Sequence, residues 1–586
     1  MKHNLILFIL IFAHMLPAMA ESQKRTPASL KAMGAPNAPQ VEIAWNRYYS
    51  YDEVMEIADR LQKAFPELVA VTSIGKSVQG RDLILLTVTN HQTGRAEAKP
   101  AMYIDGNIHS NEIQGTEVSL YTAWYLAESF GTVEWITDLL NRKAFYIVPS
   151  INPDARDYFI RRPNSPHSPR SGLLPRDDDG DGAIDEDGYD DLNGDGEIVQ
   201  MRRLDKRGRW IADPQIPNLM IRVEADQKGK YELLGWEGID NDNDGRINED
   251  GPGYYDPNRN WGWNWQPDYV QRGADQYPFS IPENRAVAEF VTSHINIAGA
   301  QSYHNAGGMI LRGPGAEEDE DLYKREDIEI YDFIAKRGEE MLPGYRYMVV
   351  GKDMYTVYGG ELDWFYGARG ILTFTNELWT SVDMFGQQDD DAGWFGRRRD
   401  THRFDRLLLF GEGTVDWQTV EHPQYGEIEI GGFRKSWTRT APSFLLEELC
   451  HRNMAFTLYH ADQMPLLSID TVSVTPLEGG IYQIDVVIGN QRLIPTRTQQ
   501  DIGNGITPPD VVAIDGEDVD IIAGFFVKEP LYDEVAEQLY HPDSIRIETI
   551  PGNGKAQVRW LLAASGTVRI TCRSQKGGVI SEKYTF

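Results

Sequence analysis

A histidine and a glutamate stand three positions apart in the segment Asp105-Gly-Asn-Ile-His109-Ser-Asn-Glu112. The segment follows an apolar, strand-like run at 101–104 and precedes a helical pattern over about 117–128. A neutral imidazole and a carboxylate are typical ligands of catalytic zinc, which takes three protein ligands and leaves a fourth position for water. The pair alone is a weak signal, because about one His-x-x-Glu is expected by chance in such a chain and a histidine beside a turn is more often a surface or capping residue. A zinc site therefore requires a third ligand elsewhere.

Further polar residues follow predicted strands and turns in a suggestive order. The apolar run 297–303 delivers His304, which would complete the three-ligand set, and the run 371–378 carries Glu377. Between the pair and Glu377 lie the turn Asn152-Pro-Asp154, the segment Asn258-Arg259-Asn260-Trp261, and Tyr355 shortly before Gly359-Gly360 and Asp363-Trp364. Strands alternating with helices predict a mainly parallel sheet, in which reactive groups gather at the strand ends.

These elements, taken in order, resemble the M14 family of zinc carboxypeptidases over about residues 48–464, apart from an acidic insertion. The resemblance implies one catalytic zinc ion and a peptide or protein substrate with a free C-terminus. It also implies roles for individual residues: His109, Glu112 and His304 as zinc ligands, Glu377 as general base, Asn258 and Arg259 as the anchor of the terminal carboxylate, and Tyr355 as a cap on the site.

Each of these roles has a physical basis and a structural alternative. A carboxylate such as Glu377 can take a proton from zinc-activated water and return it to the leaving amine. A guanidinium such as Arg259 pairs bidentately with a free carboxylate, which selects a chain end over an internal bond. Alternatively, Glu377 is a strand-end ion-pair partner, Arg259 a link to the insertion and Tyr355 a core residue.

The family also uses an arginine that stabilises the oxyanion, expected after the Asn152-Pro-Asp154 turn. Arg161 lies at about the right interval, and Arg162 and Arg170 compete with it. The sequence does not decide between them. Leu362 lies near the position that, by resemblance, lines the pocket for the terminal side chain, which favours apolar or aromatic ends. A pocket for basic ends would need an acid there, which Glu361 or Asp363 could supply.

Over about 170–256 we expect regular structure to give way to an acidic insertion. It contains three loops with carboxylate or amide oxygens at positions 1, 3 and 5 and glycine at position 6. This spacing is typical of loops that wrap around calcium, although the acid expected at position 12 is replaced by Gly188, Arg202 and Gly251. Acids at positions 9 to 11 of the first and third loops could substitute, and the alternative is a solvated acidic loop. The predicted calcium ligands are Asp177, Asp179, Asp181 and Asp185, then Asp191, Asn193 and Asp195, then Asp240, Asp242, Asp244 and Asp250.

The N-terminus predicts export. A basic start, a short apolar run and an Ala-x-Ala site indicate a signal peptide over 1–20, followed by a leader over 21–44. The alternative is an uncleaved membrane anchor. We expect a secreted or periplasmic protein without a membrane span after cleavage. The net charge of −32 argues against a nucleic-acid partner, and Cys450 and Cys572 are expected to be buried free thiols.

The sequence therefore predicts an α/β domain over 45–466, with a mixed, mainly parallel sheet flanked by helices, and a C-terminal all-β sandwich over 467–586. The expected function is that of an exported zinc metallocarboxypeptidase stabilised by calcium. Two other hypotheses stay open: an amidase of cell-wall peptides, and a catalytically silent, calcium-dependent surface-binding protein on a peptidase fold.

Overall fold

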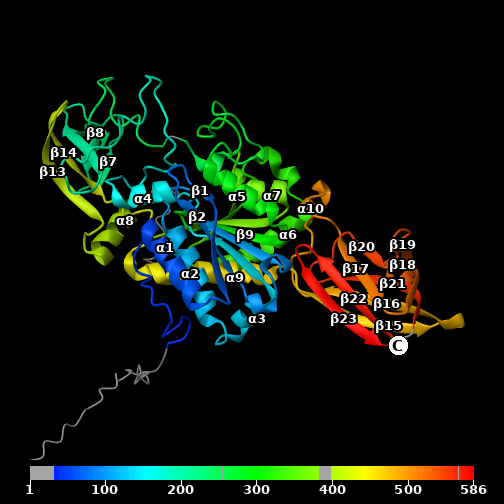
Figure 1. Ribbon diagram of the computed structural model, residues 1–586. Helices are drawn as coiled ribbons and strands as arrows, with labels where there is room; N and C mark the ends of the chain where they lie inside the picture. Colours follow the sequence, from blue (N-terminus) through cyan, green and yellow to red (C-terminus); the bar gives the residue numbers. More distant parts are fainter. Residues whose placement is uncertain (1–31, 254, 382–397, 565, 586) are drawn as a thin grey trace, which may run out of the picture.

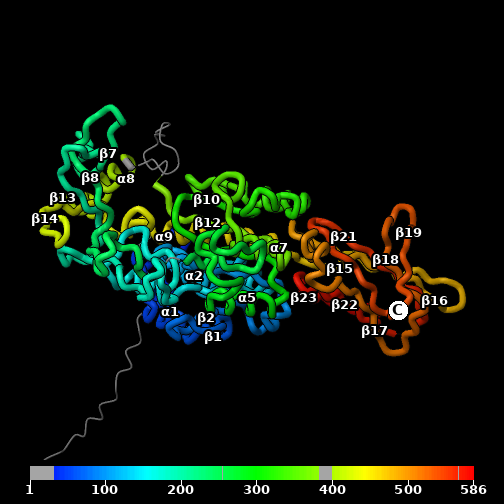
Figure 2. Tube along the Cα trace, turned by 90° about the horizontal axis from the view of Figure 1, so that it is seen from above, coloured from blue at the N-terminus to red at the C-terminus, as the bar shows by residue number. Residues whose placement is uncertain are grey.

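The computed structural model describes residues 32–253, 255–381, 398–564 and 566–585. The predicted signal peptide at 1–20 and the first part of the leader lie outside these residues. Figure 1 shows an α/β body in the middle, a small sheet with β13 and β14 at one end, and the strands β15 to β23 at the other end. The view turned by 90° shows the same arrangement, so the two smaller parts lie on opposite sides of the body (Figure 2).

The central sheet has eight strands in the order β1-β2-β4-β3-β9-β12-β10-β11. Four of the contacts between neighbouring strands are parallel, namely β4 with β3, β3 with β9, β9 with β12, and β10 with β11. The strands are β1 (Val69–Lys76), β2 (Asp82–Val88), β3 (Ala101–Gly106), β4 (Ala144–Val148), β9 (Ile297–Asn305), β10 (Met309–Arg312), β11 (Arg346–Val349) and β12 (Leu372–Leu378). The prediction of a mixed, mainly parallel sheet is confirmed.

Helices cover both faces of this sheet. The helices are α1 (Tyr51–Ala64), α2 (Gln114–Ser129), α3 (Glu134–Arg142), α4 (Pro153–Arg161), α5 (Pro282–Ser293), α6 (Arg325–Met341), α7 (Glu361–Arg369), α8 (Arg398–Phe404) and α9 (Ser443–Gln463). Met102 and Ile104 of β3 pack into the core with α1, α2, α3, α6 and α9, whereas Ala101 and Tyr103 pack into the core with α5 and α7. Because both faces are covered, the strand is apolar almost throughout rather than alternating.

The middle strands position the candidate site. β3, β9 and β12 are consecutive in the sheet and parallel, so their carboxyl ends meet at one edge. His304 and Glu377 stand directly opposite each other on β9 and β12, and the loop that carries His109 follows β3. Ligands of α/β sheets bind at such an edge.

The insertion is more regular than the sequence predicts. It forms β5 (Gln200–Leu204), β6 (Trp210–Ala212), β7 (Met220–Arg222) and β8 (Tyr231–Trp236), which join β13 (Thr414–His422) and β14 (Gly426–Phe433) in one antiparallel sheet. Arg202 pairs with Glu429, which lies 227 positions later in the chain. The expectation that regular structure gives way over this region is wrong. The strands β5 to β8 pair with one another inside the insertion, and β5 also pairs with β14, which lies far outside it.

The C-terminal strands form two antiparallel sheets around their own core. Their orders are β15-β16-β21-β18-β19 and β20-β17-β22-β23. The elements are β15 (Leu467–Pro476), β16 (Ile481–Asn490), α10 (Gln499–Asn504), β17 (Asp510–Gly516), β18 (Val519–Glu529), β19 (Glu534–Glu537), β20 (Ser544–Ile547), β21 (Lys555–Ala564), β22 (Thr567–Ser574) and β23 (Gly578–Thr585). The predicted all-β fold is confirmed, and Cys450 and Cys572 are buried and free.

Within the described ranges, no helix combines the length and apolar character needed to cross a bilayer.

Candidate active site

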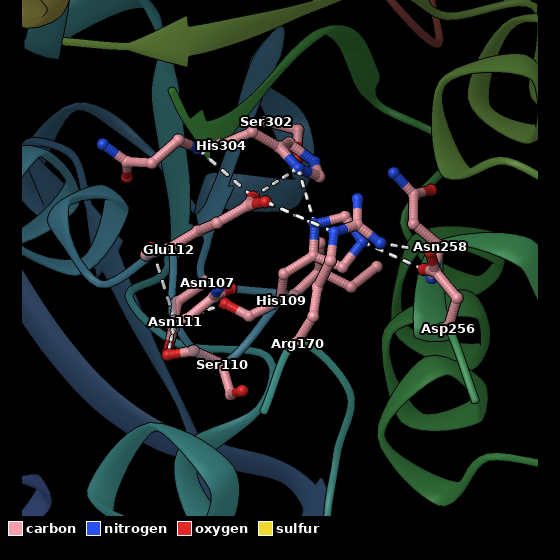
Figure 3. Close-up of polar contacts among 12 residues, drawn as sticks. Asn107, His109, Ser110, Asn111, Glu112, Arg170, Asp256, Asn258, Ser302 and His304 are labelled. Atoms are coloured by element: carbon pink, nitrogen blue, oxygen red, sulfur yellow. Dashed lines mark hydrogen bonds and ion pairs between the residues drawn. The ribbon is translucent and has the colours of Figure 1, made fainter. Parts of the chain in front are cut away.

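Three side chains converge at the sheet edge in the arrangement that zinc requires. One oxygen of Glu112, Oε2, lies 2.9 Å from His109 Nδ1 and 2.9 Å from His304 Nδ1, and the two ring nitrogens are 3.2 Å apart. All three residues are buried, and Figure 3 shows them pointing toward a common centre. Two imidazole nitrogens and one carboxylate oxygen around one point match the donor set of a catalytic zinc site. These residues therefore fit the metal that the sequence predicts.

The loop between β3 and α2 is shaped by short-range contacts. Asn107 has a positive φ of 59°, and its side-chain amide donates to the carbonyls of His109 and Ser110. Gly106 and Gly115 let the helix approach the sheet closely, because a Cβ on Gly106 would lie 2.6 Å from the carbonyl carbon of Gly115. The loop is thus held in the conformation that turns His109 and Glu112 toward the same point.

Asp256 supports the site, and the sequence reading missed it. Its Oδ1 lies 2.9 Å from His109 Nε2, so it can fix the tautomer that leaves Nδ1 free to bind a metal. Burial alone would raise the pKa of Asp256, but the charges of Arg170 and Arg259 and the contact with His109 hold that pKa well below its usual range. The available signal was its place just before the Asn258-Arg259 pair.

Replacing Asp256 with asparagine should weaken zinc binding by about 10-fold to 100-fold, the usual cost of losing a partner of a ligating histidine. The amide lacks the charge that stabilises the donated hydrogen bond of His109. Competition with a chromophoric chelator would measure the affinity, with Asp268→Asn as a control in the same region. Equal zinc affinity in Asp256→Asn and the unchanged protein would contradict the supporting role.

The structure distinguishes Arg170 from Arg161 as candidates for the arginine that stabilises the oxyanion. The guanidinium of Arg170 bonds to Asp256 and lies 3.7 Å from Glu112 Oε1, so it borders the metal ligands. Arg161, in contrast, is half exposed on α4, where it bonds to Asp157 at 3.0 Å and Asp52 at 2.9 Å. Arg161 thus ties α4 to the start of α1, and the structure does not bring it to the candidate site.

Glu377 lies in the same cavity as the ligands. Burial raises its pKa to about 7, the neighbouring Glu112 adds to this rise, and His304, Arg439 and Arg170 oppose it. A carboxyl group with a pKa near neutrality is suited to proton transfer. Arg439 is a second residue that the sequence reading missed. It lies 3.5 Å from Glu112 Oε1 and donates to the carbonyl of Asn305 at 2.7 Å.

The predicted carboxylate anchor lines this cavity too. Arg259 is buried and donates to the carbonyl oxygen of its neighbour Asn258 at 2.7 Å. The Oδ1 of Asn258 accepts from the amide of Glu361 at 2.8 Å, which fixes the orientation of the Asn258 side chain. Tyr355 is 50% exposed and belongs to the same lining, so it can cover the opening.

Part of the lining of the cavity is apolar. Its apolar lining consists of Leu311, Val350, Met354, Val357 and Leu362. Asp363 also lines it, but its carboxylate accepts from the amide of Gly315 at 2.8 Å and from the hydroxyl of Tyr323 at 2.9 Å. Glu361 is not part of the lining and instead bonds to Ser302 at 3.0 Å. The acids beside Leu362 are therefore engaged in structural contacts.

A larger cavity of about 560 Å³ is lined in part by Arg439. Strands of the insertion sheet and the residues after β9 and β12 line it together, including Trp236, Phe433, Trp379 and Arg439. Because Arg439 also lies 3.5 Å from Glu112, the insertion comes close to the candidate site at this cavity.

The first and third acidic loops lie together, and the second does not join them. Carboxylates from both loops form groups compact enough to hold a cation: Asp179, Asp242, Asp244 and Glu249; Asp179, Asp181, Glu186 and Asp242; Asp177, Asp179 and Asp250; Asp187, Asp240 and Asp242. In the part of the chain that the structure describes, Asp185, Asp191 and Asp195 belong to no such group. Asn193 instead donates to Asp195 within its own loop at 3.0 Å.

Comparison with known proteins agrees with the geometry. Residues 54–170 and 234–390 match the family model described as zinc carboxypeptidase (Peptidase_M14), and residues 466–585 match a domain of unknown function, DUF8731. A 114-residue stretch is 34% identical to carboxypeptidase B of Astacus astacus, covering 20% of this chain and 35% of that protein. The catalytic chain of human carboxypeptidase N is 32% identical over 124 residues, covering 21% of this chain and 27% of that protein.

Among solved structures, thrombin-activatable fibrinolysis inhibitor aligns with 18% identity and a TM-score of 0.42, covering 71% of this chain and 77% of that chain. The chain spans between 7% and 35% of the length of the first curated relatives that it matches. The matched segments contain the residues of the candidate site from His109 to Glu377. The chain belongs to the M14 family of zinc carboxypeptidases.

Proposed function

We propose that the protein is an exported zinc metallocarboxypeptidase that hydrolyses the C-terminal peptide bond of peptides or proteins. The observation that carries the proposal is one cavity lined by His109, His304, Glu377 and Arg259, with Glu112 grouped against the two histidines. Three metal ligands, a base and a carboxylate anchor are the groups that removal of a terminal residue requires.

Each of these residues has its own role in the proposed hydrolysis. When bound, zinc polarises a carbonyl and lowers the pKa of bound water to about 7. Glu377 accepts the proton of the attacking water and delivers it to the leaving amine. Arg170 faces the negative charge that develops on the carbonyl oxygen. Arg259 and Asn258 hold the terminal carboxylate, and Tyr355 closes over it.

The lining of the cavity supports a preference for apolar or aromatic terminal residues. Leu362, Met354 and Leu311 contribute apolar surface, and Asp363 is already engaged by Gly315 and Tyr323. Burying a basic side chain there would leave its charge poorly compensated. The larger cavity beside Arg439 would receive the residues upstream of the cleaved bond.

Peptides with a free C-terminus should be shortened, and the same peptides with an amidated end should not. Only the free end offers the charge that Arg259 pairs with. Replacing Arg259 with glutamine should lower kcat/KM on free-ended peptides by roughly 30-fold to 5000-fold, because a buried charge pair loses about 2–5 kcal/mol when one partner is removed. Mass spectrometry of a peptide library would measure both effects, with Arg325→Gln on α6 as a control.

The same library tests the other hypotheses. Release from amidated peptides would contradict the carboxypeptidase assignment. Cleavage of cell-wall peptides alone would favour the amidase, because Arg259 suits any carboxylate-ended amide. Bound zinc with no hydrolysis of any free-ended peptide would favour the silent binding protein. The intact set of ligands together with Glu377 supports an active enzyme.

We also propose that calcium is a second, structural cofactor, held by the first and third acidic loops. Their donors are oxygens only, which suits a hard cation such as calcium rather than zinc. The secretion signal predicted at 1–20 supports a secreted or periplasmic location, where calcium is available at higher concentration than inside a cell.

A further inference from the structure

We infer that the first and third acidic loops exchange ligands to form two reciprocal cation sites, and that these sites hold Arg170 and Asp256 in place at the zinc centre. The cation sites themselves do not depend on the proposed function. The effect on the zinc centre rests on it only in assigning zinc to His109, Glu112 and His304.

The exchange follows from the positions of the carboxylates. Asp177 and Asp179, at positions 1 and 3 of the first loop, gather with Asp250 from position 11 of the third. Asp240 and Asp242, at positions 1 and 3 of the third loop, gather with Asp187 from position 11 of the first. Each loop thus lacks its own acid at position 12 and receives an aspartate from the other.

Two buried aspartates have the properties of cation ligands. Asp187 and Asp250 are both 0% exposed, and each has one oxygen, Oδ2, without a hydrogen-bond partner in the described structure. Their backbones pair with each other as an isolated antiparallel bridge. Buried charges are normally paired or bound to a metal, because an unpaired carboxylate away from water is costly. Asn241 donates to the other oxygen of Asp187 at 3.0 Å, which leaves Oδ2 directed elsewhere.

Two chain segments connect the acidic loops to the candidate site. One precedes the first loop and contains Arg170, and the other follows the third loop and contains Asp256. Asp250 Oδ1 accepts from the amide of Asp178 at 3.4 Å, and the hydroxyl of Tyr255 accepts from the amide of Leu174 at 3.0 Å. The segments therefore run side by side from the acidic loops. One reaches Arg170 and the other reaches Asp256, and the two side chains bond to each other.

The segment with Arg170 also rests on the loop that carries the zinc ligands. The amide of Ser110 donates to the carbonyl of Arg170 at 3.2 Å, and Asn152 donates to the carbonyl of Ser171 at 3.1 Å. Asp256 in turn contacts His109. Without a cation, the crowded carboxylates repel one another and favour separation of the two segments. With a cation, they are drawn together, and Arg170 and Asp256 are held against the zinc ligands.

Calcium titration of the full-length protein, freed of metal on a chelating resin, tests the reciprocal sites. We expect two bound calcium ions by calorimetry and a higher melting temperature in calcium, with magnesium as the comparison ion. Asp187→Asn and Asp250→Asn should each weaken one binding step at least tenfold, and the double variant should weaken both. Asp191→Asn, in the second loop, should bind calcium as the unchanged protein does.

The pairing within each site gives a sharper test. Adding Asp240→Asn to Asp187→Asn should cost little more than either change alone, because both residues serve one site. Adding Asp177→Asn to Asp187→Asn should impair both steps. Absence of calcium binding at millimolar concentration would overturn the cation sites. Equal effects of the two pairings would overturn the exchange of ligands.

Zinc affinity tests the coupling without relying on peptidase activity. Calcium should raise zinc affinity by about 10-fold, since Asp256 is held as partner of His109, and Asp187→Asn should lose this increase. Equal zinc affinity with and without calcium would overturn the coupling. If the calcium-loaded and zinc-loaded protein cleaves no free-ended peptide, the proposed function fails, while the two affinity measurements still decide this inference.

Discussion

Replacing Glu377 with glutamine should leave zinc bound and lower kcat by about 100-fold to 10,000-fold, the usual contribution of a positioned general base. The amide has nearly the same shape as the carboxylate but cannot accept the proton of the attacking water. Zinc content by mass spectrometry and kcat on a free-ended peptide would measure both outcomes.

Glu283→Gln is a matched control for this variant. Glu283 is also buried, and burial raises its pKa to about 7 as well, but it lies on α5 and accepts from the amide of Val78. It should keep normal activity. Comparable kcat in Glu377→Gln and in the unchanged protein would refute the assigned base, whereas loss of zinc would indicate a structural role for Glu377.

The pH dependence has a definite sign. Glu377 must be ionised to accept a proton, so activity should be present above its pKa and fall as the pH drops through it. Burial places that pKa at about 7 in the protein without metal. A bound divalent cation favours the ionised form, so the acidic limb of kcat/KM should lie below pH 7 in the zinc-loaded enzyme.

Replacing Arg170 with alanine should lower kcat by about 100-fold to 1000-fold, the typical cost of losing one oxyanion donor. Arg170 lies 3.7 Å from Glu112, the proposed zinc ligand, and lines the same cavity as Glu377. Its positive charge is therefore available where the carbonyl oxygen becomes negative. The measurement should be made at saturating zinc, because Arg170 also bonds to Asp256, the partner of His109.

Arg161→Ala is the natural control, since Arg161 was the competing candidate. It removes two partly exposed ion pairs with Asp157 and Asp52, which contribute little to stability because solvent screens them. Its kcat should stay within about twofold of the unchanged protein. A large loss in Arg161→Ala together with normal turnover in Arg170→Ala would reverse the assignment.

The local parts of the site could be predicted from the sequence. His109 and Glu112 lie in one loop, and His304 and Glu377 follow apolar runs that the structure shows as neighbouring parallel strands. Strand ends of such a sheet meet at one edge, so the convergence of these residues follows from the pattern of strands and helices. The all-β character of the C-terminal part likewise follows from its alternating runs.

The tertiary structure decided the contacts between distant segments. By its interval along the chain Arg161 was a candidate, with Arg170 in competition. The helix α4 carries Arg161 to Asp52, however, while the next segment returns Arg170 to Glu112. Arg439 shows no local motif, and Asp256 shows only its place before the Asn258-Arg259 pair. Both join the site only through folding. The insertion sheet depends on strands 227 positions apart, as in the pairing of Arg202 with Glu429.

In the acidic loops, too, some features follow from the sequence and others only from the tertiary structure. The sequence by itself determined which residues offer oxygen ligands and that position 12 lacks an acid, because this spacing is a local property. Only the tertiary structure decided that Asp187 and Asp250 serve the opposite loops, and that the second loop stands apart. The reason is physical: loop spacing is set by the backbone of a few residues, whereas partners that meet across the fold are chosen by packing of the whole chain.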